Sequence, residues 1–135
     1  MLDNDLQNFT GTENYIKHQF GALLFTDGIN YLRDKADCFW LVDAIASHQS
    51  EKLDQIADGF QLWMLESAPT AERPSRAILT CRADTGTKPF LEQIIPICNF
   101  PFDQFREPLK LYVEGIGRPQ GMQVSGRVLL LPSEH

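Results

Sequence analysis

Residues 37–49 read Asp-Cys-Phe-Trp-Leu-Val-Asp-Ala-Ile-Ala-Ser-His-Gln. Their apolar side chains leave almost no polar face, which is typical of a helix buried in the interior. Asp37 is the predicted N-cap of this helix. Asp43 is a carboxylate in its middle, and a charged group placed there needs a polar partner. The stretch therefore predicts a core helix and singles out Asp43 as a candidate site residue.

The composition is that of an ordinary globular protein, with 43% hydrophobic and 22% charged residues. The 135 residues fit a single domain spanning 1–135. No run approaches the roughly 20 consecutive apolar residues of a membrane span. The first residues, Met-Leu-Asp-Asn-Asp, lack the positive charge of a secretion signal. We therefore expect a cytoplasmic protein that does not associate with membranes.

The net charge of −6 disfavours nucleic-acid binding, which requires a basic surface. Residues 1–60 hold ten acidic and four basic side chains, whereas residues 61–135 hold eight of each. Six of the seven arginines lie in the second part: Arg73, Arg76, Arg82, Arg106, Arg118 and Arg127. If several of them share one face, that face could bind an anion or a nucleotide.

Cysteine and motif patterns indicate neither a metal nor a cofactor. Cys38, Cys81 and Cys98 are odd in number and far apart, which fits neither a disulfide framework nor a zinc site. Their apolar neighbours favour buried thiols over a catalytic one. The chain also lacks the histidine spacings of helical metal sites, a dinucleotide fingerprint and a nucleophile elbow. We predict no metal site and no cofactor.

Helical spacing dominates the first part of the chain and alternating spacing the second. Helices are predicted over residues 12–20, with a capping box at residues 10–13, over residues 28–36, capped by Thr26 or Asp27, and over the core helix. Leu53 and Ile56 allow a short further helical turn. Strands are predicted over residues 60–66, 76–83, 90–95, 109–114 and 128–131.

The strand patterns also predict how the sheet is exposed. Residues 60–66 are apolar on both faces, which indicates an interior strand, and Pro96 confines residues 90–95 to an edge. Clean alternation in two strands predicts a wetter face that carries Arg82, Lys110, Tyr112 and Glu114. Together the patterns predict an α+β fold, with about three N-terminal helices packed on one face of a mostly antiparallel sheet of about five strands. The helical part would cover residues 8–58 and the strand part residues 60–132.

Three polar side chains are candidate catalytic residues: Asp43, His18 and Asp27. Asp43 could lie at the surface or in a polar contact with another helix, or it could lie in a cleft, as a base or an anchor for a cationic group. His18 shares a helix face with Tyr15 and could meet Asp27 or Asp43 across the helix packing. Asp27 precedes a glycine and is either a helix start or a catalytic aspartate on a tight turn. Candidate ligand-binding residues are Tyr15, Trp40, Arg82 and Tyr112.

An unusual group of aromatic side chains follows the third predicted strand. Phe100, Phe102 and Phe105 lie close together, and Phe90 precedes them in the chain. They are hard to bury on one regular face because Pro101 interrupts the segment. Two interpretations stay open: a plug at the end of the core, or a patch for a partner or a second copy of the chain.

Several segments resemble a small uncharacterised bacterial family, found in cyanobacteria and in mobile or phage-derived DNA. They are residues 8–15 with His18, residues 26–32, and residues 40–49, with weaker similarity over residues 60–65 and 129–134. The resemblance covers most of the chain, and its N-terminal half is the specific part. It implies no activity, cofactor or catalytic residue.

The leading hypothesis is a small cytoplasmic binding or interaction module without catalysis, with a protein partner or a homodimer as its form of association. One alternative is a hydrolase-type enzyme with a site between the helices, formed by His18, Asp27 and Asp43. The other is an anion or nucleotide binder that uses the arginines of the sheet.

Overall fold

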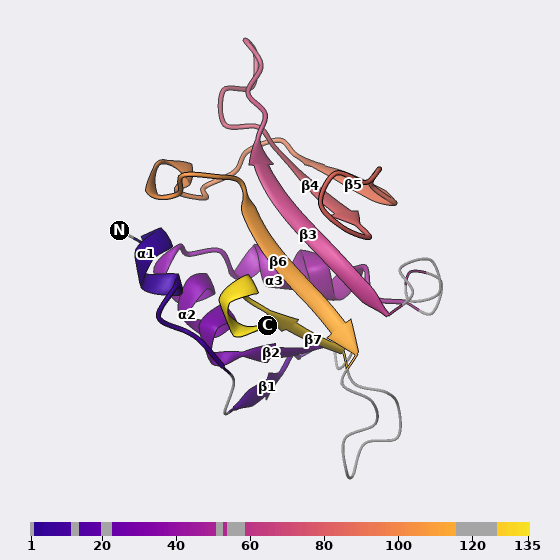
Figure 1. Ribbon diagram of the computed structural model, residues 1–135. Coiled ribbons are helices and arrows are strands. Elements are labelled where there is room, and N and C mark those ends of the chain that lie inside the picture. Colours follow the sequence, from indigo (N-terminus) through magenta and orange to yellow (C-terminus); the bar gives the residue numbers. More distant parts are fainter. Residues whose placement is uncertain (1, 12–13, 20–22, 51–52, 54–58, 116–126) are drawn as a thin grey trace.

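The computed structural model describes residues 2–11, 14–19, 23–50, 53, 59–115 and 127–135. Over these residues the fold is α+β, with three α-helices and one seven-stranded mixed sheet (Figure 1). The helices are α1 (Leu2–Leu6), α2 (Asp27–Lys35) and α3 (Phe39–Ser47). The strands are β1 (Tyr15–Lys17), β2 (Leu24–Thr26), β3 (Phe60–Ser67), β4 (Ala77–Arg82), β5 (Leu91–Ile95), β6 (Leu109–Gly115) and β7 (Arg127–Leu130). Two 3-10 turns are η1 (Phe102–Gln104) and η2 (Pro132–Glu134).

The sheet joins strands from both parts of the sequence, in the order β1-β2-β7-β6-β3-β4-β5. β2 and β7 are parallel, and all other described neighbours are antiparallel. The predicted five strands are thus an underestimate, because β1 and β2 have three residues each, too few to show alternation. The predicted division into a helical and a strand part is also wrong, since β2 pairs with β7.

The first predicted helix, over residues 12–20, is wrong for the residues that the structure describes. Residues 15–17 form β1, which pairs with β2 in the register Tyr15–Thr26, Ile16–Phe25 and Lys17–Leu24. Pairing across the β1–β2 hairpin prevails over the local capping-box signal. The N-terminal helix is instead α1, whose Leu2 and Leu6 are buried.

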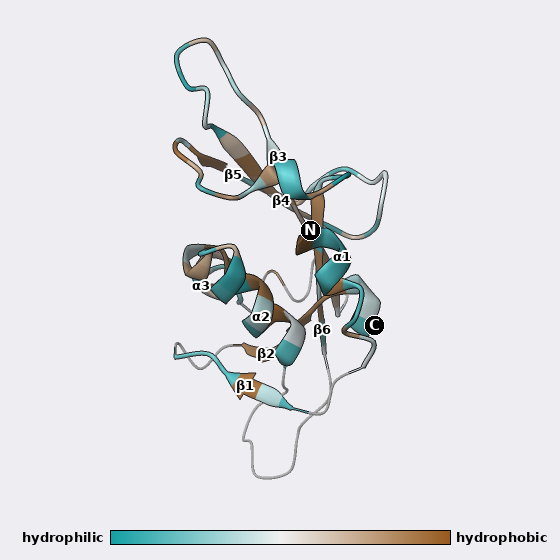
Figure 2. Cartoon of the chain, turned by 90° about the vertical axis from the view of Figure 1, so that its left-hand side faces the viewer, coloured by the Kyte–Doolittle hydropathy of each residue, from teal (hydrophilic) through white to brown (hydrophobic). Residues whose placement is uncertain are grey.

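The core helix prediction is confirmed for α3. Leu41, Val42 and Ile45 have no exposed surface, and α2 contributes the equally buried Ile29 and Leu32. Figure 2 shows α2 and α3 on the same side of the sheet. Burial of each such side chain stabilises the fold by roughly 1.5–3 kcal/mol. One stripe of α3 remains open to solvent, however, because Phe39 is 45% exposed.

The connection between α2 and α3 differs from the predicted one. Asp37 does not cap α3; it has a φ of 51° and ends α2. The N–H of Cys38 donates to the carbonyl of Arg33, and that of Asp37 to Asp34, which is the Schellman pattern of helix termination. The N-cap of α3 is Cys38, which makes no side-chain cap bond.

The N-terminus of α2 confirms Thr26 as its cap, since the Thr26 hydroxyl accepts from the N–H of Ile29. That hydroxyl donates in turn to Oε1 of Glu134, at 2.6 Å. The buried Glu134 carboxylate also accepts from the N–H of Leu131, at 3.0 Å. The start of α2 and the turn η2 are therefore held together around one carboxylate.

The strand predictions of the second half agree closely with β3 to β7. β3 lies between β4 and β6. Its adjacent residues Leu62 and Trp63 point to opposite faces of the sheet, and each is 1% exposed. β5 is at the sheet edge, as Pro96 predicts. Strand register places Arg82, Leu62 and Tyr112 side by side on the face away from the buried Trp63.

The aromatic segment after β5 is partly a core plug. Phe100 is 5% exposed, and its ring centroid lies 5.1 Å from that of Phe102 and 5.0 Å from that of Phe105. Phe90 is 37% exposed and stays apart from this group. Ile56 of the predicted short turn and Arg118 lie outside the described residues.

Candidate functional site

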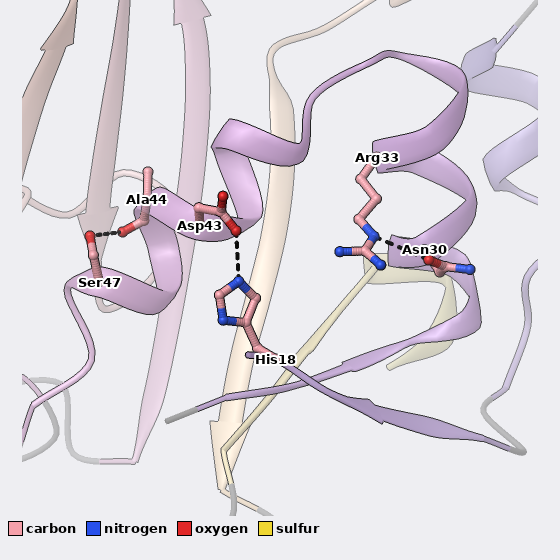
Figure 3. Close-up of polar contacts among 6 residues, drawn as sticks. All are labelled: His18, Asn30, Arg33, Asp43, Ala44 and Ser47. Carbon is pink, nitrogen blue, oxygen red and sulfur yellow. Dashed lines mark hydrogen bonds and ion pairs between the residues drawn. The ribbon is translucent and has the colours of Figure 1, made fainter. Parts of the chain in front are cut away.

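His18 and Asp43 meet, as one of the sequence hypotheses allows. Nε2 of His18 lies 2.7 Å from Oδ1 of Asp43 (Figure 3). His18 follows β1, where its N–H donates to the carbonyl of Leu23, and Asp43 lies in the middle of α3. His18 therefore comes from the hairpin and not from a helix. Because a carboxylate only accepts hydrogen bonds, Nε2 of His18 is the donor in this pair.

The two partners differ in exposure. The His18 side chain is 2% exposed, whereas that of Asp43 is 43% exposed. The imidazole is thus enclosed, and the carboxylate is the member of the pair that faces solvent. A buried polar ring bonded to a more exposed carboxylate fixes the orientation of that carboxylate.

The pair borders a cavity of about 250 Å³, here called the His18 pocket. The pocket lies between the β1–β2 hairpin, α2 and α3. Its lining residues include His18, Asp43, Lys17, Phe25, Arg33 and Phe39. Two cations, one carboxylate and two aromatic rings therefore surround a small space.

Arg33 is the second fixed polar group of this pocket. Its guanidinium carbon lies 4.3 Å from the ring centroid of Phe25 and 4.7 Å from that of Phe39, which are cation–π distances. Its Nε donates to Oδ1 of Asn30 at 3.1 Å (Figure 3). Arg33 is thus held in place by two rings and an amide.

Asp27 does not join His18 and Asp43. Its Oδ2 accepts from Nδ2 of Asn14 at 3.2 Å, at the exposed start of α2. It lines a second open cavity of about 360 Å³, here called the Asp27 pocket, together with Tyr31 and Asp34. Arg33 and Phe39 border both cavities. The structure thus brings together two of the three candidate catalytic residues.

The four candidate ligand-binding residues lie apart. Tyr15 is 50% exposed on β1, and Trp40 donates from Nε1 to Oδ1 of Asn99 at 2.7 Å. Arg82 donates to the carbonyl of Thr87 and to the hydroxyl of Thr80, while its Nε is buried with no hydrogen-bond partner among the described residues. The ring of Tyr112 packs near Phe60 and His135. None of the four lines the His18 pocket.

Three of the five described arginines of the second half make separate contacts: Arg76, Arg82 and Arg106. Arg76 and Arg82 lie at opposite ends of β4, and Arg76 donates to the carbonyl of Ala68. Arg106 lines a cavity of about 360 Å³ beside α1 and η2. These contacts do not bring the three side chains together.

Cys38 and Cys81 are buried, as predicted, whereas Cys98 is only partly buried. Burial raises the pKa of Cys38 and of Cys81 to about 12, and burial also raises the pKa of Cys98. Thiols with such pKa values are poor nucleophiles at neutral pH.

Within the described ranges, no group of three potential metal-ligating side chains occurs. No helix in the described part of the chain has both the length and the apolar character needed to cross a bilayer.

Sequence reasoning missed Lys17, Phe25, Arg33 and Phe39 as pocket residues. Arg33 follows Ile29 and Leu32 on α2, among the polar residues of that helix. The one local signal is the spacing of Asn30 and Arg33, three residues apart on the same helix face. The two aromatic partners come from β2 and α3, so that only the tertiary structure reveals the group.

Comparison with known proteins adds the family but no activity. No curated protein and no solved structure matches the chain. A family model, described as a family of unknown function, matches residues 1–135. The chain therefore belongs to the DUF6876 family.

Proposed function

We propose that the protein is a small binding module, without a catalytic step, and that the His18 pocket holds its ligand. The observation that carries this proposal is the 2.7 Å contact between buried His18 and the more exposed Asp43 at the pocket wall. Ligand pockets are typically concave and contain a small number of polar groups that point toward the same space. Arg33 supplies a second such group.

The direction of exposure favours binding over nucleophilic catalysis. In a catalytic triad the carboxylate is buried and the imidazole faces the nucleophile. Here Asp43 is the exposed partner, and Nε2 of His18 is engaged with it. The described pocket lining also contains no serine, threonine or cysteine side chain. The arrangement presents an oriented carboxylate to a ligand.

Amide NMR of the ¹⁵N-labelled protein, titrated with mixtures of small polar fragments, tests the proposal. We expect shifts concentrated at His18, Arg33 and Asp43, and weaker shifts in an Asp43→Asn variant. Asp34→Asn is the matched control, because Asp34 lies on α2 but lines only the Asp27 pocket. Fragments that shift other regions alone, or that bind Asp43→Asn equally well, would contradict the proposal.

A hydrolase-type enzyme is the second candidate, and the same histidine–carboxylate contact favours it. In this case Asp43 is the general base that faces the substrate, and His18 is a positioning residue. Asp27 takes no part, because it lines the other pocket. Release of p-nitrophenol from its acetate and phosphate esters provides the assay. Turnover that Asp43→Asn abolishes and Asp34→Asn retains would place this candidate first.

We also propose that the chain acts as one domain in the cytoplasm of a bacterium, cyanobacteria and mobile DNA being the origin that the sequence resemblance implies. The net charge of −6 supports a function without nucleic acid.

Self-association would use β5, an edge strand whose Ile94 is 54% exposed. Light scattering after gel filtration should then show a dimer that Ile94→Glu dissociates. A monomeric parent protein at working concentration would exclude this association.

A further inference from the structure

We infer that the His18 pocket takes a small carboxylate with a neighbouring hydroxyl or amino group, with Arg33 binding the carboxylate and Asp43 the donor group. This inference rests on the proposed binding function and specifies its ligand class. It follows from the hydrogen-bonding capacity that the two side chains retain.

Arg33 retains donors that match a carboxylate. Only its Nε makes a hydrogen bond to a described residue, that to Asn30, so its two terminal amino groups have no acceptor in the described structure. The described residues also place no carboxylate within 4.0 Å of it. Contacts with Phe25 and Phe39 hold the guanidinium plane in place. A planar, prepositioned guanidinium favours two parallel hydrogen bonds to a carboxylate.

Asp43 retains an acceptor. His18 engages Oδ1, and no described residue donates to Oδ2. A side chain that is 43% exposed can present this oxygen to a ligand. Figure 3 places the Arg33 guanidinium on the α2 side and the His18–Asp43 pair on the α3 side of the same region. A ligand between them would present an anionic group to one wall and a donor to the other.

The charge of the pocket lining and the volume of the cavity narrow the class of ligand further. Lys17, Arg33 and Asp43 together contribute a net charge of +1 to the lining. A ligand with one net negative charge complements this lining. The cavity of about 250 Å³ is smaller than the roughly 300–1,000 Å³ of pockets for drug-sized ligands. Short hydroxy acids fit both criteria, whereas amino acids fit the geometry but carry no net charge.

NMR titration with four probes tests the inference: lactate, alanine, propionate and lactamide. Propionate lacks the donor group and lactamide lacks the carboxylate, while all four have similar size. We expect lactate to bind most tightly, with propionate and lactamide each weaker by about tenfold. Arg33→Lys should weaken the binding of lactate by about tenfold and leave the affinity for lactamide unchanged. Lysine keeps the charge but lacks the planar guanidinium that binds a carboxylate with two hydrogen bonds. Asp43→Asn should reduce the preference for lactate over propionate to about twofold.

The controls separate this inference from the proposed function. Lys35→Met removes a cation from the same helix without touching the pocket lining and should bind lactate like the parent protein. Thermal unfolding shows which variants fold, and Arg33→Met replaces Arg33→Lys if the latter does not. Equal affinity for lactate, propionate and lactamide, or lactate binding that is insensitive to Arg33, would overturn the ligand class and leave the pocket intact. If neither these probes nor the fragment mixtures shift the pocket amides, the binding function fails as well.

Discussion

Replacement of Gly28 by alanine is the sharpest test of the packing around Glu134. A Cβ at residue 28 would lie 2.5 Å from Oε1 of Glu134 and 2.6 Å from Cδ1 of Leu131. Ordinary contacts at a Cβ begin near 3.4 Å, so both neighbours must move by almost 1 Å. The Glu134 carboxylate cannot move outward without giving up the hydrogen bond from Thr26.

The expected loss in free energy of unfolding of the Gly28→Ala variant has three contributions. Overpacking of a well-filled site costs about 1–3 kcal/mol. Loss of one hydrogen bond to a charged group costs about 1.5–3 kcal/mol. Alanine recovers about 1 kcal/mol over glycine in a helix interior, and less in the first turn. The Gly28→Ala variant should therefore be less stable by about 2–4 kcal/mol, which lowers Tm by roughly 6–16 °C for a chain of this size.

Urea unfolding followed by tryptophan fluorescence measures this loss, since Trp63 is buried in the core. Gly11→Ala is the control, because a Cβ at residue 11 would have no neighbouring atom within 4 Å, and it should change stability by less than about 0.5 kcal/mol. In a Glu134→Ala background the Gly28→Ala penalty should become smaller, because the contact with Glu134 and the loss of its hydrogen bond no longer contribute, while the contact with Leu131 remains. A Gly28→Ala protein as stable as the parent would refute the described packing.

Three further predictions concern other parts of the fold. Asp37→Gly should stabilise the protein by about 0.5–1 kcal/mol in urea unfolding, because Asp37 has a φ of 51°, which glycine adopts without strain; Asp37→Ala should give no gain. Asn99→Asp should destabilise the protein by about 1–2 kcal/mol. The Asn99 amide nitrogen donates to the carbonyl of Asp37 at 2.8 Å and its oxygen accepts from Trp40, whereas a carboxylate can only accept. Unchanged stability would contradict this pair of hydrogen bonds. Burial raises the pKa of Cys38 and Cys81 from 9.0 to about 12, so these thiols stay protonated in the folded protein when the unfolded chain has lost their protons. Stability should therefore hold below pH 9 and fall between pH 9 and 12 by roughly 1.4 kcal/mol per pH unit and thiol, and Cys81→Ala should show a shallower decline; parallel pH profiles would refute this linkage.

Local patterns were sufficient where burial alternates or repeats along one segment. Leu109, Leu111 and Val113 alternate with polar residues, and the structure buries these three. The apolar run of α3 likewise predicted the core helix. In both cases the signal and the structure that it predicts lie within a few residues of each other.

The rest depends on contacts between distant segments. β2 is a strand because β7 lies beside it, about 100 residues further along the chain. Glu134 is 108 residues from Thr26 along the chain, and only the fold brings the two together. The meeting of His18 with Asp43 was among the sequence hypotheses, but from the wrong secondary structure, and Arg33 was not anticipated at all.

The parallel pairing of β2 with β7 has a consequence for biosynthesis. During translation, β2 emerges from the ribosome long before residues 127–130 are made. Until then β1 is its only sheet partner among the described strands, and a hairpin of two three-residue strands is at best marginally stable on its own. Since the β1–β2 hairpin also positions His18, the pocket should form late, only after residues 127–130 have left the ribosome.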